Sequence, residues 1–211
     1  MIRIDEASLS MLRERVMGQM SPKRFRHTLA VEEMVARLCE LYCPEQTDLL
    51  RAAALLHDVT KELGAEEQIA LCERYALPVS EEDCCSPKTF HARTAAALIP
   101  VEFGAFAHET VIQAVRWHTT GHGGMTLTEK LLYLADYIDS SRSFENCVIL
   151  RRYFWGADPQ SMTAAQREAL LRDTLLLSYD MTIRDLLAEG APVAIHTVEA
   201  RNELLVQRQK A

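Results

Sequence analysis

Four histidines and two aspartates occur in the sequence on, or directly after, segments with the apolar pattern of a helix. They are His27, His57, Asp58, His91, His118 and Asp136. A buried imidazole or carboxylate is costly unless it is hydrogen-bonded or bound to a cation. Imidazole and carboxylate groups are also ligands of first-row divalent metals. If the six side chains converge, they would form a site for two metal ions.

The adjacent pair His57-Asp58 is the most informative of these positions, because it closes the apolar run 51–56. Two neighbouring polar groups at the end of such a helix double the desolvation cost unless something binds them. We expect the Asp58 carboxylate to bridge two ions while His57 holds one of them. The expected division places His27, His57 and Asp136 on one ion, and His91 and His118 on the other.

Each of these residues also has a simpler interpretation. A single histidine on an apolar helix face is usually a hydrogen-bonded core residue, and a single aspartate at a helix end is usually a cap. A helical scaffold with core histidines is therefore an alternative to a metal site. The presence of all six residues, each near a separate predicted helix apart from the His57-Asp58 pair, favours the metal site.

Composition limits the class of protein. The chain has 211 residues, of which 48% are hydrophobic and 25% charged, as in an ordinary globular domain with one substantial core. Its net charge of −7 argues against a broad nucleic-acid surface. A polyanionic substrate would need positive charge concentrated at one place, supplied by metal ions and a few basic side chains.

The sequence predicts a cytoplasmic protein. The N-terminal segment lacks the apolar run of a signal peptide, and no stretch of 18 apolar residues predicts a membrane span. The six cysteines have no C-x-x-C spacing, so we interpret them as reduced thiols. Cys39 and Cys43, one helical turn apart, could touch a metal, but we interpret them as small apolar side chains.

The apolar spacing predicts an all-α protein, a single helical bundle of about nine helices with no β-alternation. We expect one domain over residues 1–211, because every gap between helices is short. The metal-binding core would cover about residues 20–145. The helices of residues 146–211 would pack on this core and help to wall a substrate pocket.

Local signals predict several helix boundaries. Ser21-Pro22 restarts the chain as a helix that ends before Pro44. A third helix runs from near Asp48 through His57, with Lys61 at its end and Gly64 as its stop. The remaining expectations are a surface loop over 77–87, a loop over 119–124, capping boxes at Thr126 and Thr163, and a final helix capped by Thr197.

The order His, His-Asp, His, His, Asp resembles that of the HD-domain superfamily of metal-dependent phosphohydrolases. In that comparison His27, His57, Asp58 and Asp136 correspond to the H…HD…D ligands, and His91 and His118 resemble the extra ligands of dinuclear members. Three local segments resemble more closely the YqeK-type symmetrical bis(5′-nucleosyl)-tetraphosphatases. These are Leu55–Lys61, His118–Gly121, and Ala135–Asp139 together with Arg142, and the resemblance covers about residues 20–205.

The resemblance implies hydrolysis of diadenosine tetraphosphate to two ADP by a metal-bound hydroxide. It also implies iron, although the ligand types alone suit Mn, Zn, Co or Mg as well. Asp58, Lys61 and His118 are the expected catalytic residues. The residues expected to contact substrate are Lys61, His91, His118, Thr119, Gly121, Asp136 and Arg142.

Lys61 and Arg142 are the candidate phosphate clamps, each with an ordinary surface cation as its alternative. Thr119 could offer its hydroxyl or backbone N–H to a phosphate, and Gly121 would let the backbone approach closely. His122 has two open interpretations, a mobile acid at the mouth of the site or a loop residue. Trp117 and Tyr137 could stack on a base, although core packing is the plainer expectation, and residues 189–192 could wall the base pocket.

The expected partner is a dinucleoside polyphosphate, with an ADP- or GDP-like product, and a homodimer is possible. No nucleic acid or membrane is expected. One rival function is that of another HD phosphohydrolase, either a nucleotidase or a nucleotide pyrophosphatase, which would differ only in its pocket. The other is a nucleotide sensor without catalysis.

Overall fold

A computed structural model describes residues 4–210, and within them helices joined by turns and loops are the secondary structure, with no β-strand. The prediction of an all-α fold is therefore confirmed. Short 3₁₀ segments cover Pro44–Gln46, Pro87–Thr89, Gly104–Phe106 and Pro159–Ser161. The α-helices are α1 Glu6–Met17, α2 Pro22–Tyr42, α3 Thr47–Leu56, α4 Ala65–Arg74, α5 Glu81–Cys85, α6 Phe90–Glu102, α7 Glu109–Trp117, α8 Leu127–Ile138, α9 Glu145–Gly156, α10 Ala164–Ala188 and α11 Ile195–Lys210.

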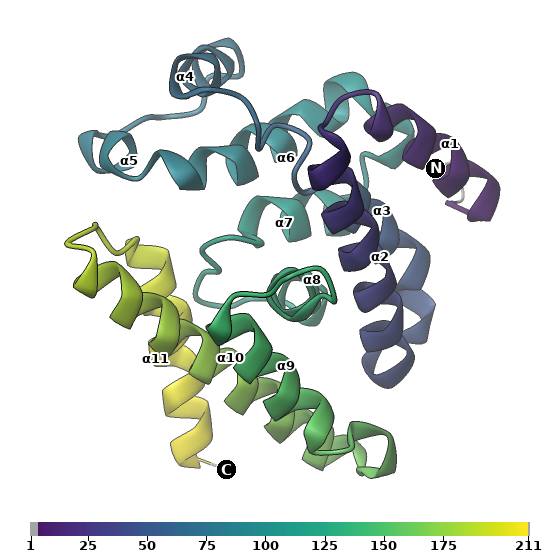
Figure 1. The fold of residues 1–211 in the computed structure, drawn as a ribbon, viewed down its shortest axis with the longest axis vertical. Helices are drawn as coiled ribbons and strands as arrows, with labels where there is room; N and C mark the ends of the chain where they lie inside the picture. The colour runs from purple at the N-terminus through teal and green to yellow at the C-terminus, as the bar shows by residue number, and fades with distance from the viewer. Residues whose placement is uncertain (1–3, 211) are drawn as a thin grey trace.

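Helix α8 lies at the centre of the molecule and is seen nearly end-on in Figure 1. Eight of its twelve residues are buried, including every residue from Leu131 to Asp136. A helix that is apolar on all sides must be surrounded by other elements. Asp136 is the charged exception within this buried stretch, so α8 carries one carboxylate into the middle of the fold.

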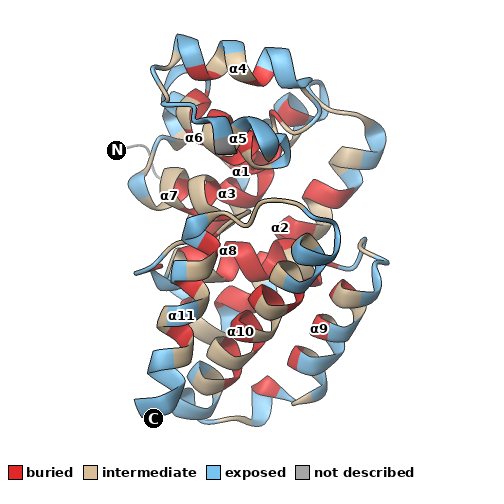
Figure 2. Cartoon of the chain, turned by 90° about the vertical axis from the view of Figure 1, so that its left-hand side faces the viewer, coloured by how far each residue is buried: buried red, intermediate tan, exposed pale blue. Residues whose placement is uncertain are grey.

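Helices α2, α3 and α7 pack on α8, and α3 also packs on both α2 and α7. Their buried faces contribute apolar side chains such as Val31, Leu55 and Val115 to one core. The buried side chains concentrate in these inner helices, while α4 and α5 are largely exposed (Figure 2). Helices α9, α10 and α11 lie together on the other side of α8 (Figure 1). None of the helices within residues 4–210 is long and apolar enough to cross a membrane.

Several predicted boundaries are confirmed by their caps. Ser21 caps α2 with Pro22 at its first position, and the Ser21 hydroxyl accepts a hydrogen bond from the Arg24 N–H at 3.2 Å. Thr126 and Thr163 each form the predicted capping box with the residue three positions later. These local interactions satisfy backbone N–H groups that the helix itself leaves free.

Two predicted helix boundaries are wrong. Helix α3 ends at Leu56 instead of continuing to Lys61, because the chain turns through i+3 hydrogen bonds from Lys61 N–H to Asp58 O and from Leu63 N–H to Thr60 O. Helix α11 begins at Ile195, so Thr197 does not cap it. The Thr197 hydroxyl donates instead to the Thr120 carbonyl at 3.0 Å, which ties α11 to the loop after α7.

The structure also has more helices than expected, eleven within residues 4–210 instead of about nine. One addition is α5, a single short helix inside the segment 77–87 that the sequence predicts to be a loop. Ser80 starts it, since its hydroxyl accepts from the Asp83 N–H at 3.1 Å while Asp83 accepts from the Ser80 N–H at 2.9 Å. This capping box stabilises a helical turn too short for apolar periodicity to reveal.

The loop between α7 and α8 is fixed by close packing at Gly121. This glycine has a φ of 62°, and a Cβ atom there would overlap the hydroxyl oxygen of Tyr179 and lie 2.9 Å from its Cζ atom. Tyr179 belongs to α10 and is fully buried. Glycine is therefore required at this position both by backbone conformation and by space.

We expect Gly121→Ala to lower the free energy of unfolding by about 3 kcal/mol, from the strained φ and the forced movement of Tyr179. Gly124→Ala is the matched control, because Gly124 also has a positive φ of 80° but has no neighbouring atom within 4 Å of a built Cβ. It should cost only about 1 kcal/mol. Urea unfolding measures both, and equal losses in the two variants would contradict the packing argument.

Candidate metal centre

The six predicted ligand residues lie together in space although they come from five separate elements. His27 belongs to α2, His57 and Asp58 follow α3, His91 belongs to α6, His118 follows α7 and Asp136 belongs to α8. All six are buried, and none is more than 8% exposed. The bundle therefore brings four imidazoles and two carboxylates into one interior site.

Asp58 lies between two pairs of imidazoles. Its Oδ2 atom is 3.4 Å from His57 Nε2 and 3.8 Å from His27 Nε2. Its Oδ1 atom is 3.3 Å from His91 Nε2 and 3.7 Å from His118 Nε2. Each carboxylate oxygen thus faces its own pair of histidines, which is the geometry of a bridging ligand.

Asp136 joins one of these pairs, with Oδ1 2.9 Å from His27 Nε2 and 3.7 Å from His57 Nε2. Ligand atoms of His27, His57 and Asp136 all lie within 4.8 Å of one another. The same holds for His57, Asp58 and His118, so His57 stands between the two halves of the cluster.

Three of the histidines are anchored in the same way. The Nδ1 atom lies 2.6 Å from the Ala54 carbonyl oxygen in His57, 2.8 Å from that of Lys88 in His91, and 2.7 Å from that of Val115 in His118. Each acceptor is the carbonyl three residues earlier, and a carbonyl can only accept. Nδ1 therefore carries a proton in each ring, and Nε2 faces the cluster.

His27 is held differently, by residues that follow α8. Its Nδ1 atom is 3.2 Å from Ser141 Oγ and 3.5 Å from Asp139 Oδ2. Asp139 is fully buried and also accepts from the Ser141 N–H at 2.8 Å. Neither Asp139 nor Ser141 is among the site residues predicted from the sequence. Asp139 follows the candidate ligand Asp136 by three residues, and this spacing could have identified it as a neighbour of the cluster.

The cluster fits divalent cations better than it fits a neutral hydrogen-bond network. The Nε2 atoms of His27 and His57 are buried, and within residues 4–210 neither makes a hydrogen bond of good geometry, although Asp136 Oδ1 lies 2.9 Å from that of His27. The Nε2 atoms of His91 and His118 are 3.0 Å apart, and the anchored Nδ1–H groups leave both with lone pairs facing each other. That separation suits two adjacent imidazole ligands at about 2.1 Å from one ion.

The electrostatics divide the histidines into two kinds. Burial lowers the pKa of His57, but the neighbouring Asp58 and Asp136 carboxylates outweigh it and raise that pKa to about 10. The pKa of His27 is also raised, since Asp136 and Asp139 outweigh burial. Burial keeps the pKa values of His91 and His118 below the ordinary value. Without metal, the carboxylates are therefore balanced by protons on His27 and His57.

Lys61, Thr119 and Arg142 border the cluster, as the sequence predicts. Lys61 Nζ is 3.1 Å from His91 Nε2, and Thr119 Oγ1 is 3.1 Å from the same atom. The Arg142 guanidinium donates to the carboxylate and to the backbone carbonyl of Asp136. It thus satisfies the end of α8 and holds one carboxylate of the cluster.

Arg24 is a site residue that the sequence analysis missed. Its Nη1 donates to Asp58 Oδ2 at 2.5 Å, and its side chain is 26% exposed. It precedes His27 by three residues on α2, so both side chains lie on one face of that helix. This spacing from a candidate ligand was the signal that could have identified it.

A buried polar network fixes the backbone of His91. The Thr60 hydroxyl is 3.0 Å from the His91 carbonyl and 2.9 Å from Thr94 Oγ1. Thr94 donates to Gln68 Oε1 at 2.7 Å, and Gln68 donates to the Thr60 carbonyl at 2.5 Å. These hydrogen bonds hold the turn after Asp58 against α6 and α4. They therefore fix the position of Asp58 relative to His91.

Gly121 and His122 lie outside the cluster. Gly121 is buried against Tyr179, so its conformation serves packing of the loop. His122 lies on Trp117, with ring centroids 4.4 Å apart, and its Nε2 is 3.5 Å from Glu129 Oε2. Of its two interpretations, these contacts favour a loop residue.

A cavity of about 420 Å³, called the site cavity below, opens beside the cluster. Lys61, Thr119, Asp136 and Arg142 line the side next to the cluster, and Tyr137 lines it with Thr182. The opposite wall is formed by C-terminal residues, including Glu189, Ala191, Pro192 and Thr197. This is the location that the sequence predicts for a substrate pocket.

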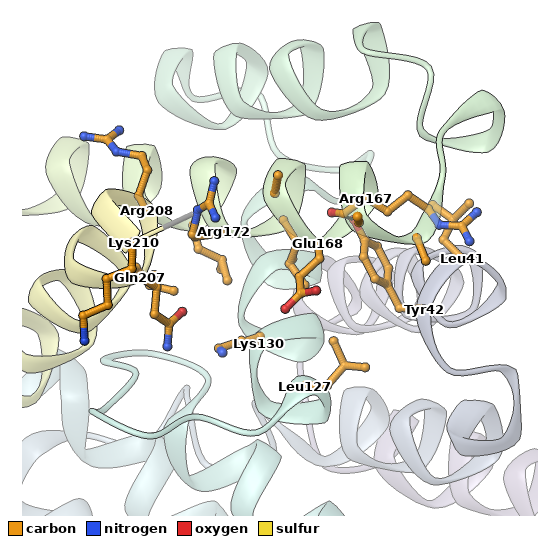
Figure 3. Close-up of a pocket in the computed structure, with 16 residues that line it drawn as sticks. Leu41, Tyr42, Leu127, Lys130, Arg167, Glu168, Arg172, Gln207, Arg208 and Lys210 are labelled. Carbon is orange, nitrogen blue, oxygen red and sulfur yellow. Dashed lines mark hydrogen bonds between the residues drawn. The ribbon is translucent and has the colours of Figure 1, made fainter.

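A larger cavity lies elsewhere in residues 4–210 and contains no predicted site residue. It measures about 1080 Å³ and is lined by residues of α2, α8, α10 and α11, among them Lys130, Arg167, Arg172, Arg208 and Lys210 (Figure 3). We call it the basic cavity. Size alone would have selected it as the site, but the buried ligand atoms border the site cavity.

Residues 24–141, more than half of the chain, match the family model for the HD domain. The chain therefore belongs to the HD-domain family, and membership of this family implies binding of divalent metal. The matched segment contains all six residues of the cluster.

Relatives of known name support this assignment. The symmetrical bis(5′-nucleosyl)-tetraphosphatase of Halalkalibacterium halodurans is 29% identical over 92% of this chain and 95% of its own length. That of Bacillus subtilis is 34% identical over 61% of this chain and 68% of its own. A solved structure from Clostridium acetobutylicum, described as a predicted HD superfamily hydrolase involved in NAD metabolism, has a TM-score of 0.80 and 30% identity, and the match covers 94% of this chain and 97% of that one.

Metal loading should release protons. At neutral pH the raised pKa of His57, about 10, means that its Nε2 must lose a proton before it can bind a cation. The pKa of His27 is also raised, whereas the lowered pKa values of His91 and His118 leave these two side chains neutral. We expect about one to two protons released per chain, so metal affinity should fall as the pH falls below about 10, the pKa of His57. Calorimetry in buffers of different ionisation enthalpy measures this number, and zero release would contradict the assigned protonation.

Asp58→Asn should reduce bound metal from about two ions per chain to less than one, because the amide cannot supply two anionic oxygens. His122→Ala is the control and should keep the full metal content, since His122 packs on Trp117 outside the cluster. Elemental analysis of protein purified without chelator measures both variants. Unchanged metal in Asp58→Asn would argue that the cluster is not the metal site.

Proposed function

We propose that this protein is a metal-dependent phosphohydrolase that cleaves diadenosine tetraphosphate symmetrically into two ADP. The observation that carries the proposal is the convergence of four imidazole Nε2 atoms and two carboxylates beside a cavity with basic side chains. The names of the two relatives support the substrate, since each is called a symmetrical bis(5′-nucleosyl)-tetraphosphatase.

We further propose that His27, His57 and Asp136 hold one ion, that His91 and His118 hold the other, and that Asp58 contacts both. When bound, such ions lower the pKa of a water molecule and neutralise phosphate oxygens. Iron is the metal that we propose, and Mn, Zn, Co and Mg are the alternatives to be tested by elemental analysis. The anchored Nδ1–H groups keep the Nε2 atoms of His57, His91 and His118 directed at this centre without rearrangement.

The surrounding cations have a separate role. Lys61 and Arg142 line the site cavity next to the cluster, and Arg24 donates to Asp58 from α2. We propose that these three side chains bind the non-bridging oxygens of the phosphate chain. A half-buried ammonium or guanidinium acts strongly there, because the charge that it meets is also removed from water.

The decisive experiment is incubation of metal-loaded protein with diadenosine tetraphosphate and separation of the products. Attack at the central anhydride gives ADP alone, and we expect no ATP or AMP. ATP together with AMP would show asymmetrical cleavage, and absence of turnover would defeat the proposal. Lys61→Met should lower kcat/KM by about 100-fold, since it removes a charged phosphate contact.

The rival activities are separated by a substrate panel in the same assay. Nucleoside 5′-monophosphates test a nucleotidase, and NAD tests a dinucleotide pyrophosphatase, which the description of the Clostridium acetobutylicum structure makes worth including. A higher kcat/KM on either than on diadenosine tetraphosphate would favour the rival. If the protein binds nucleotide but hydrolyses no member of the panel, the result would favour a sensor.

A further inference from the structure

A second cavity flanks the site cavity and has nearly the same volume, about 410 Å³ compared with about 420 Å³. We call it the flanking cavity. It lies between the segment that begins at Pro78, helices α6 and α7, and the start of α11. None of the six residues of the metal cluster lines it.

The two cavities share three lining residues, Thr89, Thr120 and Ala194. Thr89 is two residues before His91, and Thr120 is two residues after His118. The boundary between the cavities is therefore formed by the same turns that present these two histidines to the cluster. A ligand long enough to occupy both cavities would pass beside the metal centre.

Arg116 supplies the flanking cavity with an unpaired positive charge. Its guanidinium stacks over the Trp117 ring, 4.1 Å from the centroid, and within residues 4–210 it has no hydrogen bond or ion pair. Stacking on an aromatic face leaves the N–H donors of the guanidinium plane free. The other arginine of the cavity, Arg93, is already paired with Asp83 at 2.9 Å.

The rest of the flanking cavity is mixed. Its polar lining residues are Ser80, Asp83, Thr89 and Thr120, and the Asp83 carboxylate is the one held by Arg93. Val79, Ala92 and Ile195 form an apolar wall, next to the half-exposed imidazole of His196. An apolar wall with one imidazole and one free guanidinium suits a nucleobase and a phosphate. A dinucleoside tetraphosphate consists of two equal halves of this chemistry, joined at the bond to be cleaved.

We infer that the flanking cavity is the subsite for the second nucleoside half of the dinucleotide, with Arg116 as the residue that binds its phosphate. This inference rests on the proposed function. It makes Arg116 a specificity residue for ligands with two nucleosides, whereas a ligand with one nucleoside would occupy the site cavity alone.

The experiment compares diadenosine tetraphosphate with adenosine tetraphosphate, which lacks the second nucleoside, in wild type and Arg116→Gln. We expect the variant to raise KM about tenfold for the dinucleotide, with kcat and metal content unchanged and KM for adenosine tetraphosphate within about twofold. Arg116→Lys should restore part of the loss. Arg167→Gln, which removes an equal charge from the basic cavity, should change neither KM.

A second variant, Val79→Trp, fills the flanking cavity from its exposed edge without removing Arg116. It should produce the same selective rise in KM, and it decides the matter if Arg116→Gln unfolds. Equal effects on both ligands, or none on either, in the folded variants would overturn the inference.

Binding to metal-free protein separates this inference from the proposed function, because no turnover is needed. Wild type should bind the dinucleotide about tenfold more tightly than adenosine tetraphosphate, and Arg116→Gln should lose this preference. If the preference is present but the loaded enzyme does not cleave the dinucleotide, the proposed function fails and the subsite stands. If wild type shows no preference, the subsite is wrong.

Discussion

The buried carboxylate of Asp58 is the constraint on which the rest of the structure depends. A carboxylate that is only 3% exposed cannot remain charged unless positive groups or hydrogen-bond donors surround it. Four imidazoles and Arg24 meet it within 3.8 Å. Because these groups come from α2, α6 and the ends of α3 and α7, the charge on Asp58 is neutralised only when these helices pack together.

Much of this site follows from the sequence because its signals are local or periodic. His27 shares the apolar spacing of α2, and the His57-Asp58 pair follows an apolar run that can only be buried. Helix caps such as Ser21 and Thr126 act within three or four residues, so they are equally visible. These features predict the all-α fold and the location of the candidate ligands on it.

Other features depend on contacts between distant segments and leave little trace in the sequence. The turn after Leu56 replaces a longer helix because Thr60 bonds to α6 and Gln68 of α4 bonds to Thr60. Thr197 has the residue type of a helix cap but donates to Thr120, which is 77 positions away. The role of Asp139 depends on its distance from His27. Only the structure reveals that Arg116 makes no hydrogen bond or ion pair within residues 4–210.

We expect the charge distribution to favour small anions over large ones. The chain carries a net charge of −7, so it repels extended polyanions, yet Arg24, Lys61 and Arg142 surround the cluster at close range. Burial strengthens these local charges, while the distant surface acidity is screened by salt within about 10 Å. A short phosphate chain that enters the cavities therefore meets the cations without the surface repulsion that a long polyanion would meet. Recognition of a ligand then depends on which chemical groups, at each end of its phosphate chain, fit the site cavity and the flanking cavity.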